Sequence, residues 1–330
     1  MEGLIEHLKD VQTHLTVEGL ETRGTADRKE HYMEDLRETF NLLTSLMYQS
    51  QEAKEAAVHS HLSTVIHNLW VWCLVDKSVL AAALFMLCSF TSKHPSGSTS
   101  MVYSLTSNTG LQQKSHTNNC LGQRIVKLAI SEQSKHVSNM QSLRLSFQLL
   151  GNMAISAECR CIMLKSNFWQ GFLNAASMKK GRKQALESLW LELLVCVSFH
   201  ADIQQAILKQ KDFLDLLLGH ATSGVRRQQR NALLVIRNLC FHTANKQKIL
   251  AHDKLLHYLT EDLSFFTTDH ERHLVVTALW TLSSNNQKGK FILKGTVLQR
   301  LQKFMEDLQP EQRDTELARD LQILIGLLLK

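Results

Sequence analysis

The chain has 330 residues, of which 44% are hydrophobic, and a formal net charge of +6, from 37 lysines and arginines against 31 aspartates and glutamates. This composition supports a large buried core, and the mild charge permits an acidic partner without indicating nucleic acid. Only two prolines occur, and sustained apolar–polar alternation is absent from the sequence. The sequence therefore argues against a fold based on sheets and favours helices throughout.

The first thirty residues predict a loosely attached helix at 1–20 and a polar link at 21–30. Met1–Asp10 does not have the charged and then apolar layout of a secretory signal peptide. The most apolar stretch, Leu69–Cys88, is interrupted by Asp76 and Lys77. Because a charged pair in mid-span is costly in a bilayer, this stretch predicts two abutting buried helices, with Asp76 as the N-cap of the second.

An internal repeat decides the fold class. Six apolar anchor residues mark the expected ends of the third helices, and all but Leu87 are followed by further apolar residues at fixed offsets. The anchors are Leu46, Leu87, Met153, Val197, Leu239 and Leu282. Four of the five steps between them measure 41, 44, 42 and 43 residues, a period typical of armadillo and HEAT repeats. Since one unit cannot bury its apolar face alone, the sequence predicts an all-α solenoid of about six stacked repeats.

The remaining step, from Leu87 to Met153, is 66 residues long and contains a stretch rich in Ser, Thr, Asn and Gly at 91–119. This stretch predicts a flexible insertion. The expected organisation is a helix and link at 1–30, repeats at 31–90, the insertion at 91–119, repeats at 120–310 and a capping helix at 311–330. The apolar end of that last helix, Leu321–Leu329, should dock on the last repeat and is too short to span a bilayer.

Cysteines and histidines do not form a metal-binding pattern. The seven cysteines are Cys73, Cys88, Cys120, Cys159, Cys161, Cys196 and Cys240. No C-x-x-C pair occurs, and Cys159 and Cys161 are too close for usual zinc ligands, so we expect the buried, reduced thiols of an intracellular protein. His200 and His242 share one repeat position, at which the other repeats have Ser156 and Asn285; this predicts a polar role at a helix end.

Motifs of the common enzyme classes are also absent from the sequence, including the phosphate-binding glycine loops, H-E-x-x-H and G-x-S-x-G. We therefore predict no catalytic residue, metal, cofactor or small-molecule substrate. The expected partners are other proteins.

Two sets of residues are candidates for partner binding, and the first is a groove. It comprises Asn152, Asn238, Arg237 and Trp280. Each asparagine comes directly before an anchor, and its amide can donate to and accept from a peptide backbone. Ser45, Met86, Cys196 and Thr281 occupy the equivalent positions elsewhere, so the regular Trp/Asn array of nuclear-import grooves is absent from the sequence. The alternative is a polar residue on a solvated helix face.

The second set, which we call the basic edge, precedes two neighbouring third helices. It comprises Lys179, Lys180, Arg182, Lys183, Arg226, Arg227 and Arg230. Positive charge at a helix N-terminus opposes the helix dipole, so folding alone does not account for it. The basic edge therefore predicts a docking site for an acidic or phosphorylated protein segment; the alternatives are a solvated loop and a weak nuclear-import signal.

Asn231–Leu250 resembles the end of the third helix and the following first helix of armadillo repeats. More narrowly, the chain resembles the C-terminal part of the rotatin family, large armadillo-like proteins of centrioles and ciliary basal bodies, most closely from Asn231 to Lys290. The resemblance implies the tail of a longer cytoplasmic protein at the centrosome, a scaffold role in centriole and basal-body assembly with centriolar partners, and a link to left-right axis specification. The alternative is an armadillo-type cargo or nucleic-acid adaptor that uses the basic edge.

Overall fold

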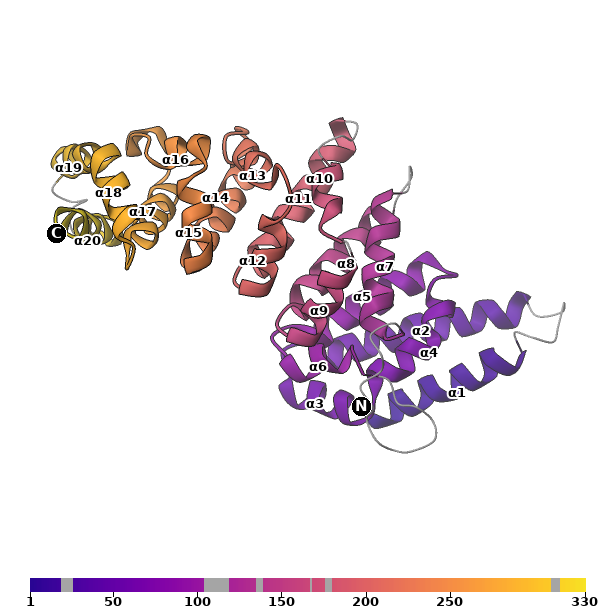
Figure 1. The fold of residues 1–330 in the computed structure, drawn as a ribbon. Helices are drawn as coiled ribbons and strands as arrows, with labels where there is room; N and C mark the ends of the chain where they lie inside the picture. The colour runs from indigo at the N-terminus through magenta and orange to yellow at the C-terminus, as the bar shows by residue number, and fades with distance from the viewer. Residues whose placement is uncertain (19–25, 104–118, 135–138, 167, 176–179, 310–314) are drawn as a thin grey trace. The chain divides into compact units, whose positions relative to one another are not determined.

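The computed structural model describes residues 1–18, 26–103, 119–134, 139–166, 168–175, 180–309 and 315–330. These residues form twenty α-helices and one short 3-10 helix (Figure 1). They divide into two compact units, Met1–Gly171 and Phe172–Lys330, and helix α10 (Gln170–Ala175) lies across the division. The predicted all-α solenoid is confirmed, because each unit is a stack of helical repeats.

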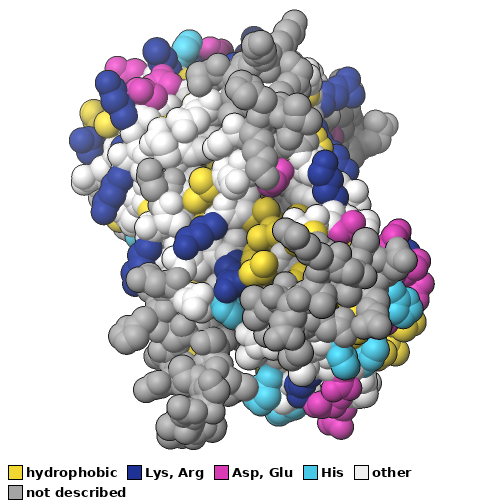
Figure 2. All heavy atoms as spheres, turned by 90° about the vertical axis from the view of Figure 1, so that its right-hand side faces the viewer, with side chains coloured by type: hydrophobic (Ala, Val, Ile, Leu, Met, Phe, Trp, Pro, Cys, Tyr) yellow, Lys and Arg dark blue, Asp and Glu magenta, His cyan; other side chains and the backbone are white. Residues whose placement is uncertain are grey.

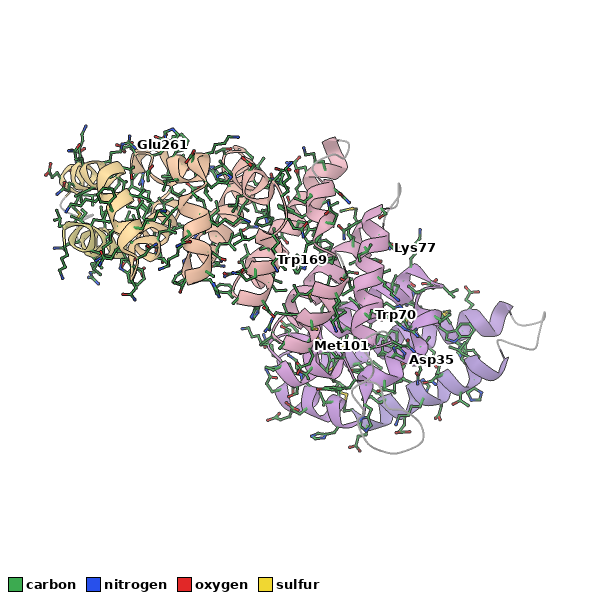
Figure 3. All side chains as sticks on the ribbon, in the orientation of Figure 1. Asp35, Trp70, Lys77, Met101, Trp169 and Glu261 are labelled. Atoms are coloured by element: carbon green, nitrogen blue, oxygen red, sulfur yellow. The ribbon has the colours of Figure 1, made fainter. Side chains whose placement is uncertain are left out.

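The first unit consists of nine described helices before α10. They are α1 (Glu2–Glu18), α2 (Ala26–Met47), α3 (Gln51–His59), α4 (Leu62–Cys73), α5 (Lys77–Thr91), α6 (Pro95–Ser100), α7 (Leu121–Ser134), α8 (Met140–Met153) and α9 (Ala157–Lys165). Helices α2, α5 and α8 take the place of third repeat helices, and each packs along the next. Trp70 and Met101 are buried among the helices of this unit (Figure 3).

One anchor of the predicted repeat is wrong by a single position. Leu46 is 47% exposed, whereas the neighbouring Met47, the last residue of α2, is completely buried. The other five anchors are completely buried at or near the ends of their helices. The predicted N-cap is confirmed: Asp76 accepts hydrogen bonds from the backbone N–H groups of Ser78 and Val79 at the start of α5.

The predicted loose attachment of the first helix is also wrong. Helix α1 packs on α2, α3 and α4 and buries an apolar stripe that includes Ile5 and Leu8. His7 on α1 hydrogen-bonds Asp35 on α2 at 2.9 Å. The predicted polar link at 21–30 overlaps α2, which begins at Ala26, and residues 19–25 lie outside the described ranges.

The predicted insertion at 91–119 begins too early. Residues 95–100 form helix α6, which packs on α3, α5, α8 and α9. His94 caps this helix by accepting the backbone N–H of Gly97, and Met101 after it is completely buried. Capping and burial together account for ordered structure in a sequence rich in serine. Residues 104–118 of the predicted insertion lie outside the described ranges.

The second unit continues the same architecture. Its helices after α10 are α11 (Lys180–Val197), α12 (Ala201–Leu208), α13 (Phe213–Ala221), α14 (Arg226–Phe241), α15 (Thr243–Leu250), α16 (Asp253–Leu259), η1 (Leu263–Phe265), α17 (Asp269–Ser283), α18 (Gln287–Thr296), α19 (Leu298–Asp307) and α20 (Glu316–Leu329). Helices α11, α14 and α17 stack in turn as third helices.

The predicted capping helix at 311–330 corresponds to α20, which docks on α17, α18 and α19. Helix α20 packs on α17 as α17 packs on α14, so α20 takes the position of a further third helix. Leu321 and Leu324 are completely buried, whereas Ile323 and Leu329 are more than half exposed. In the described parts of the chain, none of the helices is both long enough and apolar enough to cross a membrane.

At three repeats, a polar side chain in the same position joins the repeat to the next one. Lys54, Gln204 and Lys246 each follow a buried anchor by seven residues. Lys54 donates to the carbonyl of Ser92 at 2.8 Å, and Lys246 donates to that of Ser284 at 2.7 Å, in both cases just past the end of the next third helix. Carbonyls at a helix C-terminus have no partner within the helix and attract positive charge, so these lysines cap the following repeat.

Candidate protein-binding surfaces

Asn238, predicted to line the groove, is instead part of a buried polar network. It is only 2% exposed, and its Nδ2 donates to Ser198 Oγ at 2.9 Å, across from α14 to the end of α11. Its Oδ1 accepts from Arg237 Nη1 at 3.2 Å, and its backbone carbonyl accepts from Gln204 Nε2 at 3.1 Å. The amide is therefore occupied by the neighbouring repeat, which argues against both a ligand contact and a solvated face.

Asn152 has the same structural role in the first unit. Its Nδ2 donates to the carbonyl of Cys88 at 3.0 Å and lies 3.4 Å from Thr91 Oγ1, so it ties α8 to the end of α5. The side chain is half-buried. Both asparagines predicted as ligand contacts thus hold neighbouring third helices together.

Arg237 and Trp280, the other predicted groove residues, occupy equivalent positions on the stacked helices α14 and α17. Arg237 places its guanidinium 4.7 Å from the centre of the exposed Phe241 ring, close enough for a cation–π interaction. Its Nε is buried and has no hydrogen-bond partner among the residues that the structure describes. Trp280 is partly exposed. These residues remain available to a partner, and their binding role stays a prediction.

The structure brings part of the basic edge together. Gln228 of α14 donates to Ser188 Oγ of α11 at 3.2 Å, so the start of α14 lies against the first turns of α11. Lys179 lies outside the described residues, as do the side chains of Lys180 and Arg182. Arg226, Arg227 and Arg230 are exposed on α14.

Acidic side chains partly neutralise this edge. Arg227 pairs with Glu192 at 2.8 Å, and Lys183 lies 3.8 Å from Glu187. Burial raises the pKa of the Glu187 carboxyl, and the nearby Lys183 lowers it in part. Arg226 and Arg230 form no ion pair with another described residue, so among the described side chains of the basic edge they carry the unpaired positive charge. On the face that Figure 2 shows, basic, acidic and histidine side chains are interspersed.

Most of the cysteine thiols are buried, and burial raises their pKa. All seven cysteines are described and are free thiols. Burial raises the pKa of Cys73, Cys88 and Cys240 to about 12, which makes these thiols unreactive at neutral pH. The expectation of buried thiols is wrong for Cys196, which is exposed on α11.

The histidine positions agree with a role at helix ends. His242 is the N-cap of α15, where its Nδ1 accepts the backbone N–H of Ala244 at 3.2 Å, and His200 is the N-cap residue of α12. Among the described side chains, no group of three or more His, Cys, Asp or Glu residues is arranged to hold a metal ion.

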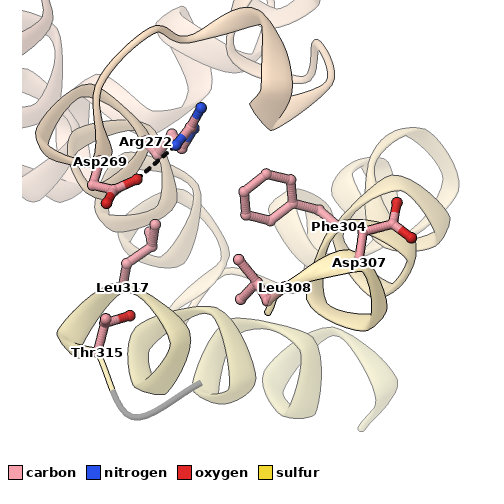
Figure 4. A pocket seen from close by; sticks show the side chains of 7 residues that line it. All are labelled: Asp269, Arg272, Phe304, Asp307, Leu308, Thr315 and Leu317. Atoms are coloured by element: carbon pink, nitrogen blue, oxygen red, sulfur yellow. Dashed lines mark hydrogen bonds and ion pairs between the residues drawn. The ribbon is translucent and has the colours of Figure 1, made fainter. Parts of the chain in front are cut away.

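A pocket of about 210 Å³ lies between α17, α19 and α20 (Figure 4). Its apolar wall is formed by Phe304, Leu308 and Leu317. Arg272 faces the pocket, but its guanidinium donates to Asp269 at 2.6 Å and to the carbonyl of Leu263 at 3.2 Å. Because the Arg272 guanidinium is already bonded within the chain, it is not left to bind an anionic ligand. We therefore interpret this pocket as a gap between packed helices.

Apolar side chains exposed on α2, directly after α2 and on α5 are the feature that sequence reasoning missed. Leu42, Leu46, Tyr48 and Phe85 are each about half exposed or more. Their signal in the sequence is an excess of apolar residues on helices whose buried stripe is already complete. Such residues are common in protein-binding surfaces.

Comparison with known proteins finds two curated relatives of similar sequence. The chain is 34% identical to human rotatin and 33% identical to mouse rotatin, in each case over 306 residues and 91% of the chain. The chain is similar to rotatin. The matched region is only 14% of the length of either relative, so the chain spans a small part of these proteins. No protein-family profile matches it.

Solved structures support the fold alone. One engineered protein of known crystal structure aligns with 98% of the chain at a TM-score of 0.66 and 14% identity, and the alignment covers 68% of that protein. Another aligns with 85% of the chain at a TM-score of 0.58 and 15% identity, and the alignment covers 98% of that protein. These likenesses support the fold of stacked helical repeats.

Proposed function

We propose that this chain is a non-enzymatic protein-binding scaffold that acts in centriole and ciliary basal-body assembly, and through these organelles in left-right axis specification. The observation that carries the proposal is the similarity to rotatin, which extends over 91% of the chain and therefore involves both helical units. Stacked repeats support a scaffold role because they offer long, rigid surfaces on which several protein segments can dock.

The exposed arginines of the basic edge are proposed to dock an acidic segment of a centriolar protein. Arg226 is the first residue of α14 and Arg230 lies one turn later. A carboxylate or phosphate brought by a partner would satisfy both arginines and would also lie near the positive end of the helix dipole. Contacts of this exposed kind control the rate of association more than the lifetime of a complex.

A nucleic-acid adaptor that uses the same edge is the alternative function. The ion pairs of Arg227 and Lys183 argue against it, because they reduce the number of charges left for phosphates. Salt dependence separates the two functions: affinity for nucleic acid should fall by orders of magnitude between about 50 and 200 mM salt if several phosphates are contacted. Binding to a protein segment should fall much less.

The test is to express the fluorescently tagged chain in dividing, ciliated cells together with a double variant, Arg226→Glu and Arg230→Glu. Arg227 is left unchanged because it pairs with Glu192. We expect the wild-type chain to concentrate at centrosomes and the variant to remain in the cytoplasm. The variant should melt at the same temperature or higher, since glutamate is favourable at a helix N-terminus.

A matched control reverses Lys209 and Lys211, two exposed lysines near the end of α12 in the same unit. This control should still reach centrosomes. A wild-type chain spread evenly through the cell would contradict the scaffold proposal. Normal recruitment of the arginine variant would instead show that another surface binds the partner.

A further inference from the structure

The first unit contains a pocket of about 490 Å³ that none of the sequence motifs indicated. It is built by the end of α2, the start of α3, the end of α5 and the middle of α8, so it spans three consecutive third helices. The side chains that matter in its wall are Tyr48, Lys54, Phe85, Lys93 and Gln148.

Two lysines give this pocket a positive charge. Lys54 is 4% exposed, and its Nζ donates to the carbonyl of Ser92. Lys93 lines the same pocket, and the pKa of Lys54 is lowered by burial and further by the positive charge of Lys93. The described residues that line the pocket include no carboxylate to balance them. An anionic group would therefore relieve a repulsion that the pocket contains.

The backbone fixes the position of Lys93 just past the end of α5. Lys93 has a φ of 51°, in the left-handed region that favours glycine. Its carbonyl accepts from Gln51 Nε2 of α3 at 3.4 Å. Gln49 and Asn285 have the same conformation two residues past the ends of α2 and α17, so this left-handed turn ends several third helices and fixes where Lys93 begins.

Two aromatic rings supply an apolar contact. Tyr48 is 69% exposed and Phe85 is 51% exposed, and both line the pocket. Gln148 adds an exposed amide that can both donate to and accept from a peptide backbone. Phe85 also lines a second hollow of about 480 Å³, with Arg37 and Lys77 in its wall.

From this geometry we propose that the pocket binds a short acidic segment of a partner protein. A bulky apolar side chain of that segment packs against Tyr48 and Phe85. A flanking carboxylate pairs with the exposed Lys93 and is also attracted by the charge of the buried Lys54. The pocket belongs to the first unit and the basic edge to the second, so the two sites share no residue. The inference rests on the protein-binding role proposed above and adds a site and a ligand class.

The probe is a fluorescein-labelled ten-residue peptide in which one phenylalanine lies between two aspartates and two glutamates. Fluorescence polarisation measures its binding to the complete 330-residue chain. Phe85→Ser should weaken binding about tenfold, because removal of an aromatic anchor commonly costs that much. Lys93→Gly should weaken it about fivefold while the melting temperature stays the same or rises, since glycine accepts the positive φ.

Matched controls are Phe291→Ser and Lys209→Gln, which remove an exposed aromatic ring and an exposed lysine of the second unit. Both should bind the probe as the wild type does. A probe with alanine in place of phenylalanine should bind at least tenfold more weakly if the aromatic contact is real. Equal binding of the two probes, or unchanged binding by Phe85→Ser, would overturn the proposal.

The outcomes also separate this site from the proposed function. If the chain binds the probe but does not reach centrosomes, the result supports the pocket and contradicts the centriolar role. A chain that reaches centrosomes but does not bind the probe contradicts the pocket alone. Competition by a short single-stranded RNA as strong as that by unlabelled probe would assign the lysines to nucleic acid and would also overturn the inference.

Discussion

Replacing Asn238 with alanine tests whether this residue joins repeats or contacts a ligand. The substitution removes two hydrogen bonds of the side chain, one to Ser198 Oγ and one from Arg237 Nη1. Each contributes about 1 kcal/mol, and leaving the charged Arg237 with one acceptor fewer adds to the loss, so we expect a destabilisation of roughly 2–3 kcal/mol. In a unit of this size, 1 kcal/mol corresponds to roughly 2–4 °C, which gives a drop in melting temperature of roughly 5–10 °C.

Differential scanning calorimetry of the purified chain measures this drop. Asn231→Ala is the matched control, because Asn231 is an asparagine of the same helix that is only half-buried and lies near the start of α14. The control should melt within about 2 °C of the wild type, as expected for a change that touches no core contact. If Asn238→Ala melted like the control, the buried network would not stabilise the stack, and the earlier interpretation of Asn238 as a ligand contact would be the better one.

Two further predictions concern the core. Leu239→Asp should unfold the second unit, because Leu239 is completely buried and an unpaired carboxylate there costs several kcal/mol; a urea transition near that of the wild type would contradict this placement of the core. His67 is buried, and burial together with the positive charge of Arg124 lowers its pKa below the ordinary value of 6.5. As the pH falls from about 6.5, the unfolded chain therefore binds a proton at His67 before the folded chain does, and the folded state loses stability. His67→Leu should reduce that loss between pH 7 and 5 in urea titrations, and an unchanged pH profile would show that other groups control it.

The solenoid could be predicted because its cause is local and repeated. Each unit must place apolar residues at the same offsets to share a core with its neighbours, and a period of 41 to 44 residues follows directly from that requirement. The error at Leu46 has an equally simple origin. Leu46 and Met47 are adjacent apolar residues, and one step along a helix turns the side chain by about 100°, so spacing alone could not decide which of them points inward.

The errors at the ends of the repeat pattern arose from composition. Serine-rich residues 95–100 suggested a flexible insertion, but a single capping histidine and the buried Met101 suffice to fix α6. Helix α1 was expected to be loosely attached because it lies outside the repeat. Its apolar residues at 5, 8, 11 and 15 nevertheless follow helical spacing, and that signal could have predicted a packed face.

The binding residues were harder to predict because a sequence shows which side chains can bond but not which bonds are already made. Asn152 and Asn238 have the chemistry to hold a peptide, yet neighbouring repeats use both amides. The pocket of the first unit could not be predicted for a different reason, because its residues come together only in the folded chain. Lys54 and Lys93 are 39 residues apart, and they meet only because α3 packs beside the loop that ends α5. A buried lysine that caps the next repeat thereby lies next to an exposed one, so the contact that stacks the repeats also creates the charge that a partner can neutralise.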